Sequence, residues 1–285
     1  MCCKKMGRWK EALDIDNRVL VLRLKVLGES HPFTMASMNN KAMALWKIGQ
    51  LKDAIALLED ALRLHRLYQP LDHPSALRCL SYLGMAYFQL GEKEKGTSYL
   101  SEALGKQTLK IGRSHKDTLL TMGQLAGAYA QSGQLEKADG LQREVLDLRL
   151  KVAPKDANAL VAAQTDLGRT LIQEHKMKEA ESLFVSALQV CKESNNSSWT
   201  YYYATSALGA CLLEEHKVSE GEPLLRKGCE GMQQKIDNMQ PEQVPYFAQA
   251  LDRLILHYNE SNKHDEMRKW QAVKDNLPKI EAAKK

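Results

Sequence analysis

The stretch that decides the fold is GQLKDAIAL at residues 49–57, because it recurs along the chain at a fixed interval. Related stretches that start 42 residues apart read GRWKEALDI at 7–15, GEKEKGTSY at 91–99, GQLEKADGL at 133–141 and HKMKEAESL at 175–183. HKVSEGEPL follows at 216–224 after 41 residues, and NKHDEMRKW comes at 262–270 after a short insertion. A fixed period of this length is typical of solenoid proteins, in which one supersecondary unit is stacked repeatedly.

Residue size within the repeat indicates what the unit is. Two small residues twelve apart flank each central turn: Ala42 and Ala54, Gly84 and Gly96, Ala126 and Ala138, Gly168 and Ala180, Gly209 and Gly221. Two antiparallel helices need small residues at their closest approach, where a bulky side chain would cost about 1–3 kcal/mol. Large residues at helical spacing surround these pairs: Leu83, Leu125, Leu167 and Leu208 in the first helix, and Leu57, Tyr99, Leu141, Leu183 and Leu224 in the second. The pattern predicts helical hairpins with these residues in the core.

Composition agrees with a helical, soluble chain. Of 285 residues, 44% are hydrophobic, 26% charged and 6% aromatic, and this balance favours helix over strand. The net charge of +5 includes no run of five basic residues, so no nucleic-acid partner is expected. No apolar run reaches the ~20 residues of a membrane span, and the N-terminus lacks a signal sequence, so no membrane partner is expected. The six cysteines form no CxxC, which favours reduced thiols and a cytoplasmic location.

The small and large positions with their central turn resemble the tetratricopeptide (TPR) motif. The 42-residue length, together with LGESHPFT at 27–34, resembles the longer repeats of kinesin light chains. The resemblance implies an all-α fold, a right-handed TPR superhelix (an α-solenoid) of antiparallel helix pairs. We expect a truncated half repeat over 1–27 with only its second helix, five repeats over 28–240, a terminal helix pair over 241–278 and a frayed tail over 279–285.

Three linker histidines, His31, His73 and His115, also recur every 42 residues. As a metal set they would have to meet, but each lies in a separate repeat, about 10 Å or more from the next at stacked-helix distances. We therefore expect them to start helices and predict no metal site.

The two ends differ in kind. Only residues 1–6 precede Gly7, where a whole first helix is expected, so the helix that follows should expose Ile15 and Val19. This predicts a fragment with further repeats upstream. At the other end, residues 222–232, 250–258 and 262–270 are similar to the TPR tail of planctomycete-type bacterial serine/threonine protein kinases, although Cys229 and Asn262 depart from that pattern. We expect Pro241 and Pro245 in a loop and Pro278 after the last helix.

No catalytic motif is present. The chain lacks the kinase motifs GxGxxG, His-Arg-Asp and Asp-Phe-Gly, and also GxxxxGK[ST], HExxH and GxSxG. His175 and His216 fall in interhelical turns, and Cys2 and Cys3 lie at the terminus, so none has a partner for acid–base or nucleophilic work. We predict no enzyme activity and no cofactor.

What the resemblance implies instead is a concave groove lined by the first helix of each pair. The groove positions carried over from the motif are Asn39, Met43, Trp46, Lys47, Arg78, Ser81, Met85, Phe88, Gln131, Thr165, Arg169, Gln173, Tyr203, Ser206 and Leu213. Their aromatic and basic members predict binding of a peptide or protein, with an acidic partner favoured. The positions that select peptides in kinesin-type grooves read Asn40, Tyr82, Gln124, Asp166 and Ala207, so that specificity does not transfer.

The resulting prediction is a non-catalytic scaffold, the C-terminal region of a multidomain serine/threonine kinase. The alternative is the helical-repeat sensor arm of a transcription or signalling regulator that binds a small ligand.

Overall fold

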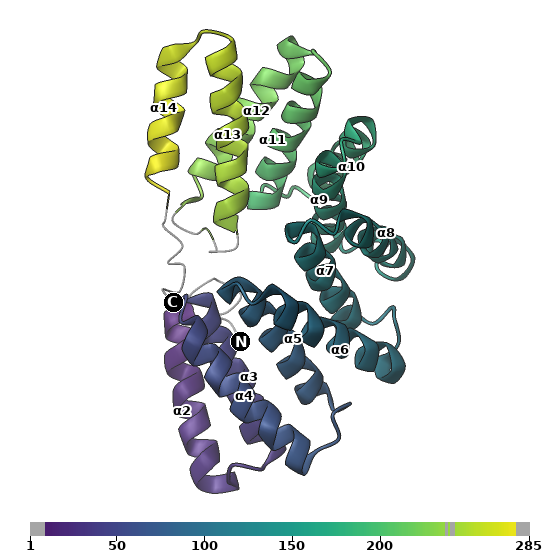
Figure 1. Ribbon diagram of the computed structural model, residues 1–285, viewed down its shortest axis with the longest axis vertical. Helices are drawn as coiled ribbons and strands as arrows, with labels where there is room; N and C mark the ends of the chain where they lie inside the picture. The colour runs from purple at the N-terminus through teal and green to yellow at the C-terminus, as the bar shows by residue number, and fades with distance from the viewer. Residues whose placement is uncertain (1–8, 237–238, 240–242, 278–285) are drawn as a thin grey trace. The chain divides into compact units, whose positions relative to one another are not determined.

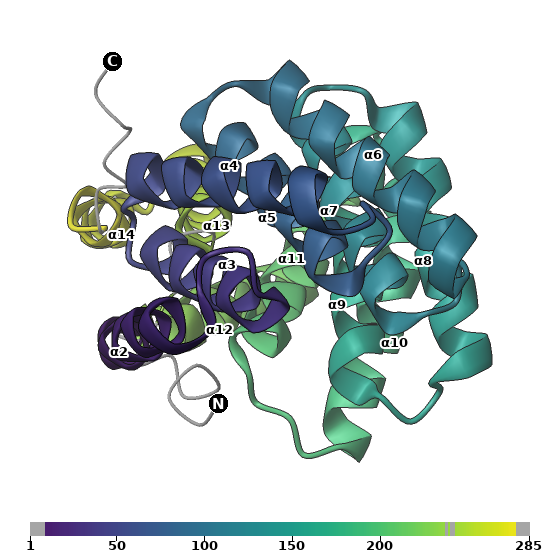
Figure 2. The ribbon, with the colours of Figure 1, turned by 90° about the horizontal axis from the view of Figure 1, so that it is seen from below.

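A computed structural model describes residues 9–236, 239 and 243–277 (Figure 1). The features predicted at residues 1–6, Cys2, Cys3, Gly7, Pro241, Pro278 and 279–285 lie outside the described residues. The described residues form thirteen α-helices, and helices such as α3 and α4, α5 and α6, and α11 and α12 form antiparallel pairs, as predicted for TPR repeats (Figures 1 and 2). None of these helices is long and apolar enough to cross a bilayer.

The chain divides into two compact units, Met1–Gly133 and Gln134–Ile280. The helices of unit 1 are α2 (Trp9–Leu27), α3 (Pro32–Lys47), α4 (Leu51–Tyr68), α5 (Pro74–Leu90), α6 (Lys93–Ile111) and α7 (Lys116–Gln131). Those of unit 2 are α8 (Leu135–Val152), α9 (Ala157–Gln173), α10 (Met177–Glu193), α11 (Trp199–Glu214), α12 (Val218–Gln233), α13 (Val244–Glu260) and α14 (His264–Asp275).

The turn after each first helix needs a left-handed residue at the same repeat position. Gly49, Gly91 and Gly133 supply it with φ of 89°, 99° and 76°. Later repeats place His175, His216 and Asn262 there, with φ of 59°, 62° and 58°. A side chain in this region is strained where glycine is not. Turn geometry is therefore retained at these positions although the residue type is not.

The linker histidines start helices, as predicted. His31, His73 and His115 are the N-caps of α3, α5 and α7. In each, the imidazole Nδ1 accepts a hydrogen bond at 3.2 Å from the backbone N–H two residues later. This bond satisfies one of the amide groups that a helix leaves unpaired at its start.

The small residues lie where helices approach closely. In unit 1, a Cβ on Gly84 would lie 2.9 Å from the carbonyl oxygen of Gly96, and one on Gly96 2.8 Å from that of Gly84. In unit 2, a Cβ on Gly209 would lie 2.7 Å from the carbonyl oxygen of Gly221. Contacts this short leave no room for a side chain, which confirms the predicted approach of α5 to α6 and of α11 to α12.

The core confirms the first-helix register and corrects the second. Leu83, Leu125, Leu167 and Leu208 are buried as predicted. Leu57, Tyr99, Leu141, Leu183 and Leu224 are only partly buried, so their assignment to the core was wrong by one position. The buried side chains are the next residues along, Leu58, Leu100, Gln142, Phe184 and Leu225. One residue turns a helix by about 100°, which moves the stripe from the core to its edge.

Helix α2 packs on α3 through Ala12 and Leu20, which are buried. Ile15 is 50% exposed and Val19 partly buried, while Val21, Leu22 and Val26 are exposed. The predicted apolar surface on this helix is therefore present among the described residues.

Candidate partner-binding faces

In unit 1 the first helices α3, α5 and α7 contact one another in sequence. Each carries a stripe of accessible residues spaced four, three and four positions apart, and the stripes are related by the 42-residue period. They comprise Ala36, Asn40, Met43 and Lys47 on α3, Arg78, Tyr82, Met85 and Gln89 on α5, and Leu120, Gln124, Gly127 and Gln131 on α7. All of these residues are exposed or partly exposed, and together they are named here the unit 1 face.

The unit 1 face is positively charged. Lys47 and Arg78 lie on it, and it contains no Asp or Glu. Arg78 is exposed and forms no ion pair with any described residue. The Lys47 ammonium lies 4.6 Å from the centroid of the Trp46 ring, a cation–π contact. Burial raises the pKa of the neighbouring Tyr82 phenol, and the charge of Arg78 acts in the opposite direction.

Five predicted groove residues, Met43, Lys47, Arg78, Met85 and Gln131, lie on this face. Four others are one position away and are buried: Asn39, Trp46, Ser81 and Phe88.

The contacts of these four residues hold neighbouring helices together. The Asn39 amide donates to the Ser75 carbonyl oxygen at 2.8 Å, and the Trp46 indole donates to Gln89 at 2.5 Å. The Ser81 and Thr121 hydroxyls are 3.1 Å apart between α5 and α7. Phe88 packs against Gly96 at the closest approach of α5 and α6. A role for these four in binding remains a prediction, since the structure shows them engaged inside unit 1.

In unit 2 the first helices α9, α11 and α13 bring a cation among aromatic rings. The Arg169 guanidinium lies 4.4 Å from the centroid of the Tyr246 ring and 3.3 Å from an Asp166 carboxylate oxygen. Trp199 stacks on Tyr203 with centroids 5.4 Å apart, and Tyr203 meets the Tyr246 ring edge-on at 6.0 Å. Arg169 and Tyr203 are only 7% and 2% exposed, so unit 2 fills this face with its own side chains.

Electrostatics keeps the Arg169 side chain charged. Burial alone would lower its pKa, but the negative charge of Asp166 and the nearby Tyr246 and Tyr203 outweigh that effect and raise the pKa. The carboxylate and the aromatic ring both stabilise the buried cation. Removing either partner would leave its charge uncompensated in the interior and would strongly destabilise unit 2. The contact therefore joins α9 to α13 across α11.

The other predicted residues of unit 2 divide in the same way. Thr165 and Ser206 are buried, and their hydroxyls donate to the carbonyl oxygens of Val161 at 2.6 Å and Tyr203 at 2.8 Å. Gln173 is exposed. Leu213 is partly buried against Gly221.

In the part of the chain that the structure describes, the side chains that could bind a metal ion or act as nucleophiles do not cluster. No three His, Cys, Asp or Glu residues there come close enough to hold a metal ion. Cys79, Cys191, Cys211 and Cys229 are free, buried thiols whose pKa is raised by burial. A thiol with a raised pKa is a poor nucleophile at neutral pH.

Sequence reasoning did not place Gln89 and Leu120 on the accessible surface. It noted Asn40, Tyr82 and Gln124 only for a peptide specificity that did not transfer. The repeat period would have identified these five residues. Met43 and Lys47 define the accessible stripe on α3, and adding 42 or 84 to its residue numbers gives the stripes on α5 and α7.

Comparisons with known proteins agree with this fold. The tetratricopeptide repeat family matches residues 1–67 and 118–156. One similar structure is a Podosopora anserina protein of nearly identical TPR-like repeats, assigned to the kinesin light chains. It is 26% identical in sequence and has a TM-score of 0.57, and the match covers 68% of this chain and 91% of that chain.

Two more distant structures share the fold alone. BtubC (BKLC) from P. vanneervenii is 16% identical over 78% of this chain and 90% of that one, with a TM-score of 0.65. A Rap protein complexed with Competence and Sporulation Factor is 14% identical over 93% and 84%, with a TM-score of 0.62. No functionally curated protein matches the sequence. The chain therefore has the TPR repeat fold, with repeats structurally similar to those of kinesin-light-chain type, and TPR repeats suggest protein–protein interaction.

Proposed function

We propose that this chain is a non-catalytic scaffold that binds a peptide or protein partner along the unit 1 face. The observation that carries the proposal is the accessible stripe that recurs with the repeat period on α3, α5 and α7. Equivalent groups at a regular pitch can contact successive segments of one extended partner. The Rap protein, which has the same fold, is complexed with Competence and Sporulation Factor, so a stack of this kind can hold a ligand molecule.

The chemistry of the face favours an acidic segment with apolar side chains. Lys47 and Arg78 provide the positive charge, and no carboxylate on the face opposes them. Met43, Met85 and Leu120 provide adaptable apolar contact, and Leu120 is 53% exposed. The Gln89 amide, whose oxygen accepts from the Trp46 indole, offers its N–H groups to a peptide backbone. Gly127 leaves room for that backbone to approach because nothing lies within 4 Å of its Cβ position.

The test is selection of peptides from a displayed random library on the purified protein. We expect the selected peptides to be enriched in Asp and Glu and to bind less tightly as salt rises from 50 to 300 mM, because the contacts are partly solvent-exposed. Arg78→Glu should weaken them about tenfold or more. The matched control is Arg66→Glu, since Arg66 is an exposed arginine on α4 and outside the face. Peptides without acidic enrichment, or equal binding by both variants, would refute the proposal.

The proposal extends to the origin of the chain: the C-terminal, cytoplasmic region of a multidomain bacterial serine/threonine kinase, with the partner as its substrate or regulator. The support is the similarity of residues 222–232, 250–258 and 262–270 to such kinase tails. These stretches lie in α12, α13 and the turn and helix of α14. Sequencing of the gene upstream tests it. A kinase domain in frame is expected, whereas a helix-turn-helix domain would favour the sensor-arm alternative.

A further inference from the structure

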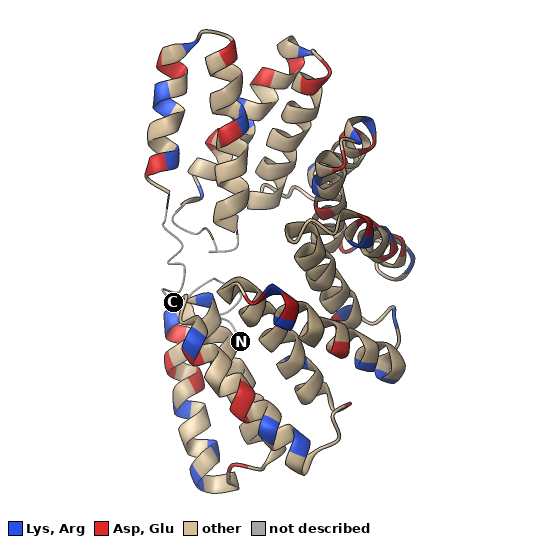
Figure 3. Cartoon of the chain, in the orientation of Figure 1, with Lys and Arg blue, Asp and Glu red and all other residues tan. Residues whose placement is uncertain are grey.

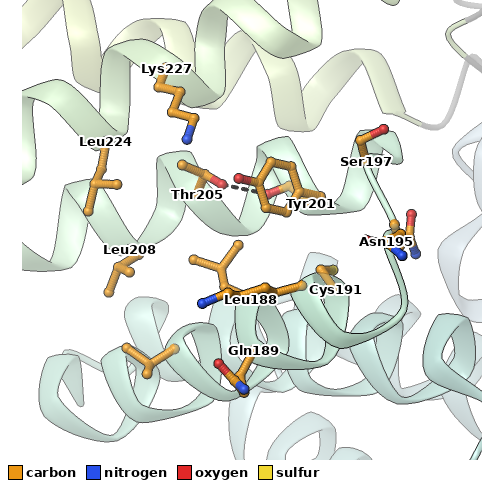
Figure 4. A pocket seen from close by; sticks show the side chains of 13 residues that line it. Leu188, Gln189, Cys191, Asn195, Ser197, Tyr201, Thr205, Leu208, Leu224 and Lys227 are labelled. Carbon is orange, nitrogen blue, oxygen red and sulfur yellow. Dashed lines mark hydrogen bonds between the residues drawn. The ribbon is translucent and has the colours of Figure 1, made fainter.

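A pocket of about 570 Å³ lies inside unit 2, where α10, α11 and α12 meet the linker before α11 (Figure 4). One side of each helix faces it. Its apolar wall includes Val185 and Leu188 on α10, Leu208 on α11 and Leu224 on α12. The volume falls in the range of small-molecule sites, and the wall has the apolar character such sites share.

The linker that borders the pocket is held in place by its own side chains. Asn195 takes a left-handed conformation with φ of 50°. The Asn196 side-chain oxygen accepts a hydrogen bond from the Ser198 N–H at 2.9 Å, and its amide donates to Asn158 at 2.8 Å. Ser198 is the N-cap of α11, and its side chain forms no capping hydrogen bond. The linker therefore contributes amide and hydroxyl groups, from Asn195, Asn196 and Ser197, to the edge of the pocket.

Charge at the pocket has one sign. Lys192 on α10 and Lys227 on α12 line it from opposite sides, and no Asp or Glu lines it. Neither lysine forms an ion pair with a described residue. Figure 4 shows the Lys227 ammonium directed toward the space between α11 and α12, above Leu208 and Leu224. Two unpaired ammonium groups over an apolar wall suit a molecule with an anionic head and an apolar body.

The pocket lies on a different side of α11 from the aromatic rings that surround Arg169, namely Trp199, Tyr203 and Tyr246. Tyr201, Thr205 and Leu208 line it at helical spacing, whereas Tyr203 lies about 200° around the α11 axis from Tyr201. The Thr205 hydroxyl donates to the Tyr201 carbonyl oxygen at 2.8 Å, and the Tyr201 side chain borders the pocket on this side.

We propose that this pocket is a binding site for a small amphiphilic anion, a carboxylate with an apolar body. The head lies between Lys192 and Lys227, and the body contacts Leu188, Leu208 and Leu224. Such a ligand fills the space between a second helix and the following pair, so it stiffens α10 against α11 and α12. The site adds small-molecule recognition to a chain whose proposed partner binds elsewhere, on the unit 1 face.

Displacement of 8-anilinonaphthalene-1-sulfonate from the full chain tests the site. The two competitors are decanoate and decan-1-ol, which share an apolar chain and differ in the charged head. We expect decanoate to displace the probe well below the concentration that decan-1-ol needs. The double variant Lys192→Gln/Lys227→Gln should bind decanoate three- to tenfold more weakly and leave decan-1-ol unchanged. The control is Lys178→Gln, an exposed lysine on α10 outside the pocket, and it should bind as the unsubstituted chain does.

A second variant keeps the test independent of charge. Val185 is 51% exposed at the rim, so Val185→Trp can fill the pocket without entering the core. It should abolish displacement by both competitors while the thermal midpoint of the chain is unchanged. Equal displacement by decanoate and decan-1-ol, an equal effect of Lys178→Gln, or full binding by Val185→Trp would overturn the proposal.

Discussion

Gly209 on α11 lies directly against the backbone of α12. A Cβ placed on Gly209 would meet the Gly221 carbonyl oxygen at 2.7 Å and the Leu225 Cα at 2.8 Å, and would also overlap the Leu225 backbone nitrogen. All three atoms are backbone, so no side-chain rotation relieves the clash. Gly209→Ala therefore has to move one helix relative to the other.

Two effects of opposite sign determine the magnitude. Overpacking destabilises a protein by about 1–3 kcal/mol, and we expect a destabilisation of about 3 kcal/mol here because the backbone is rigid. Replacing glycine by alanine inside a helix returns about 1 kcal/mol through helix propensity. The net expectation is a loss of about 2 kcal/mol in the free energy of unfolding. Gly140 on α8 isolates the second effect, because nothing lies within 4 Å of its Cβ position and it is exposed. Gly140→Ala should gain about 1 kcal/mol.

Urea unfolding followed by circular dichroism at 222 nm measures both variants. With a slope of about 2 kcal/mol per molar urea, Gly209→Ala should lower the midpoint by about 1 M, and Gly140→Ala should raise it by about 0.5 M. A Gly209→Ala protein as stable as the unsubstituted chain would refute the backbone contact and, with it, the reason that small residues recur in this repeat.

Other expectations concern turns, caps and thiols. His175→Gly and His216→Gly should each raise the free energy of unfolding by about 1 kcal/mol, and with it the urea midpoint, because glycine removes the strain of a side chain in the left-handed conformation. Gly91→Ala should lower the midpoint for the same reason. His73→Ala should cost about 1 kcal/mol in the same assay, and His73→Asn, which keeps a capping acceptor, should cost less. Burial raises the pKa of Cys211 to about 12. A thiol in the unfolded chain ionises near pH ~8.5. The protonated, buried thiol therefore contributes its full stability below that pH, and the contribution is lost as pH rises toward 12. The urea midpoint should fall between pH 9 and 11, and less so in Cys211→Ala; an identical fall in both would show that other groups cause it.

The fold could be predicted from the sequence because its strongest constraints are local and repeated. The turn residues and the small pairs recur with the period, and their roles follow from steric limits that any helical hairpin obeys. The second-helix register could not be fixed in the same way. Leu57 and Leu58 are both leucines, and Tyr99 and Leu100 are both large and apolar, so composition alone does not tell the core stripe from its edge. The division after Gly133 was not predicted either, since no change in composition marks it.

Burial of four predicted groove residues, Asn39, Trp46, Ser81 and Phe88, could not be predicted for a different physical reason. Within each unit a first helix such as α5 or α11 contacts its own partner and the first helices before and after it, so many of its residues are buried (Figure 2). Contacts between successive first helices use small polar residues, such as Asn39 and Ser81, which from sequence alone look like surface residues. Figure 3 shows the extreme case, α11, which carries almost no charge along its length because its neighbours enclose it.

Polarity is therefore a poor guide to the accessible stripe of a first helix, and charge without an ion pair is a better one. In unit 1, Arg78 satisfies that criterion, and its stripe neighbours at spacings of three and four are accessible as well. In unit 2, Arg169 does not, because Asp166 and Tyr246 hold it. Charge reversal at Arg78 should thus change binding with little effect on folding, whereas Arg169→Glu would leave Asp166 facing a second carboxylate and should unfold this part of unit 2, at a cost of about 3–5 kcal/mol. Equal urea midpoints for the two variants would show that the distinction between a free and an engaged arginine does not separate the binding face from the packed one.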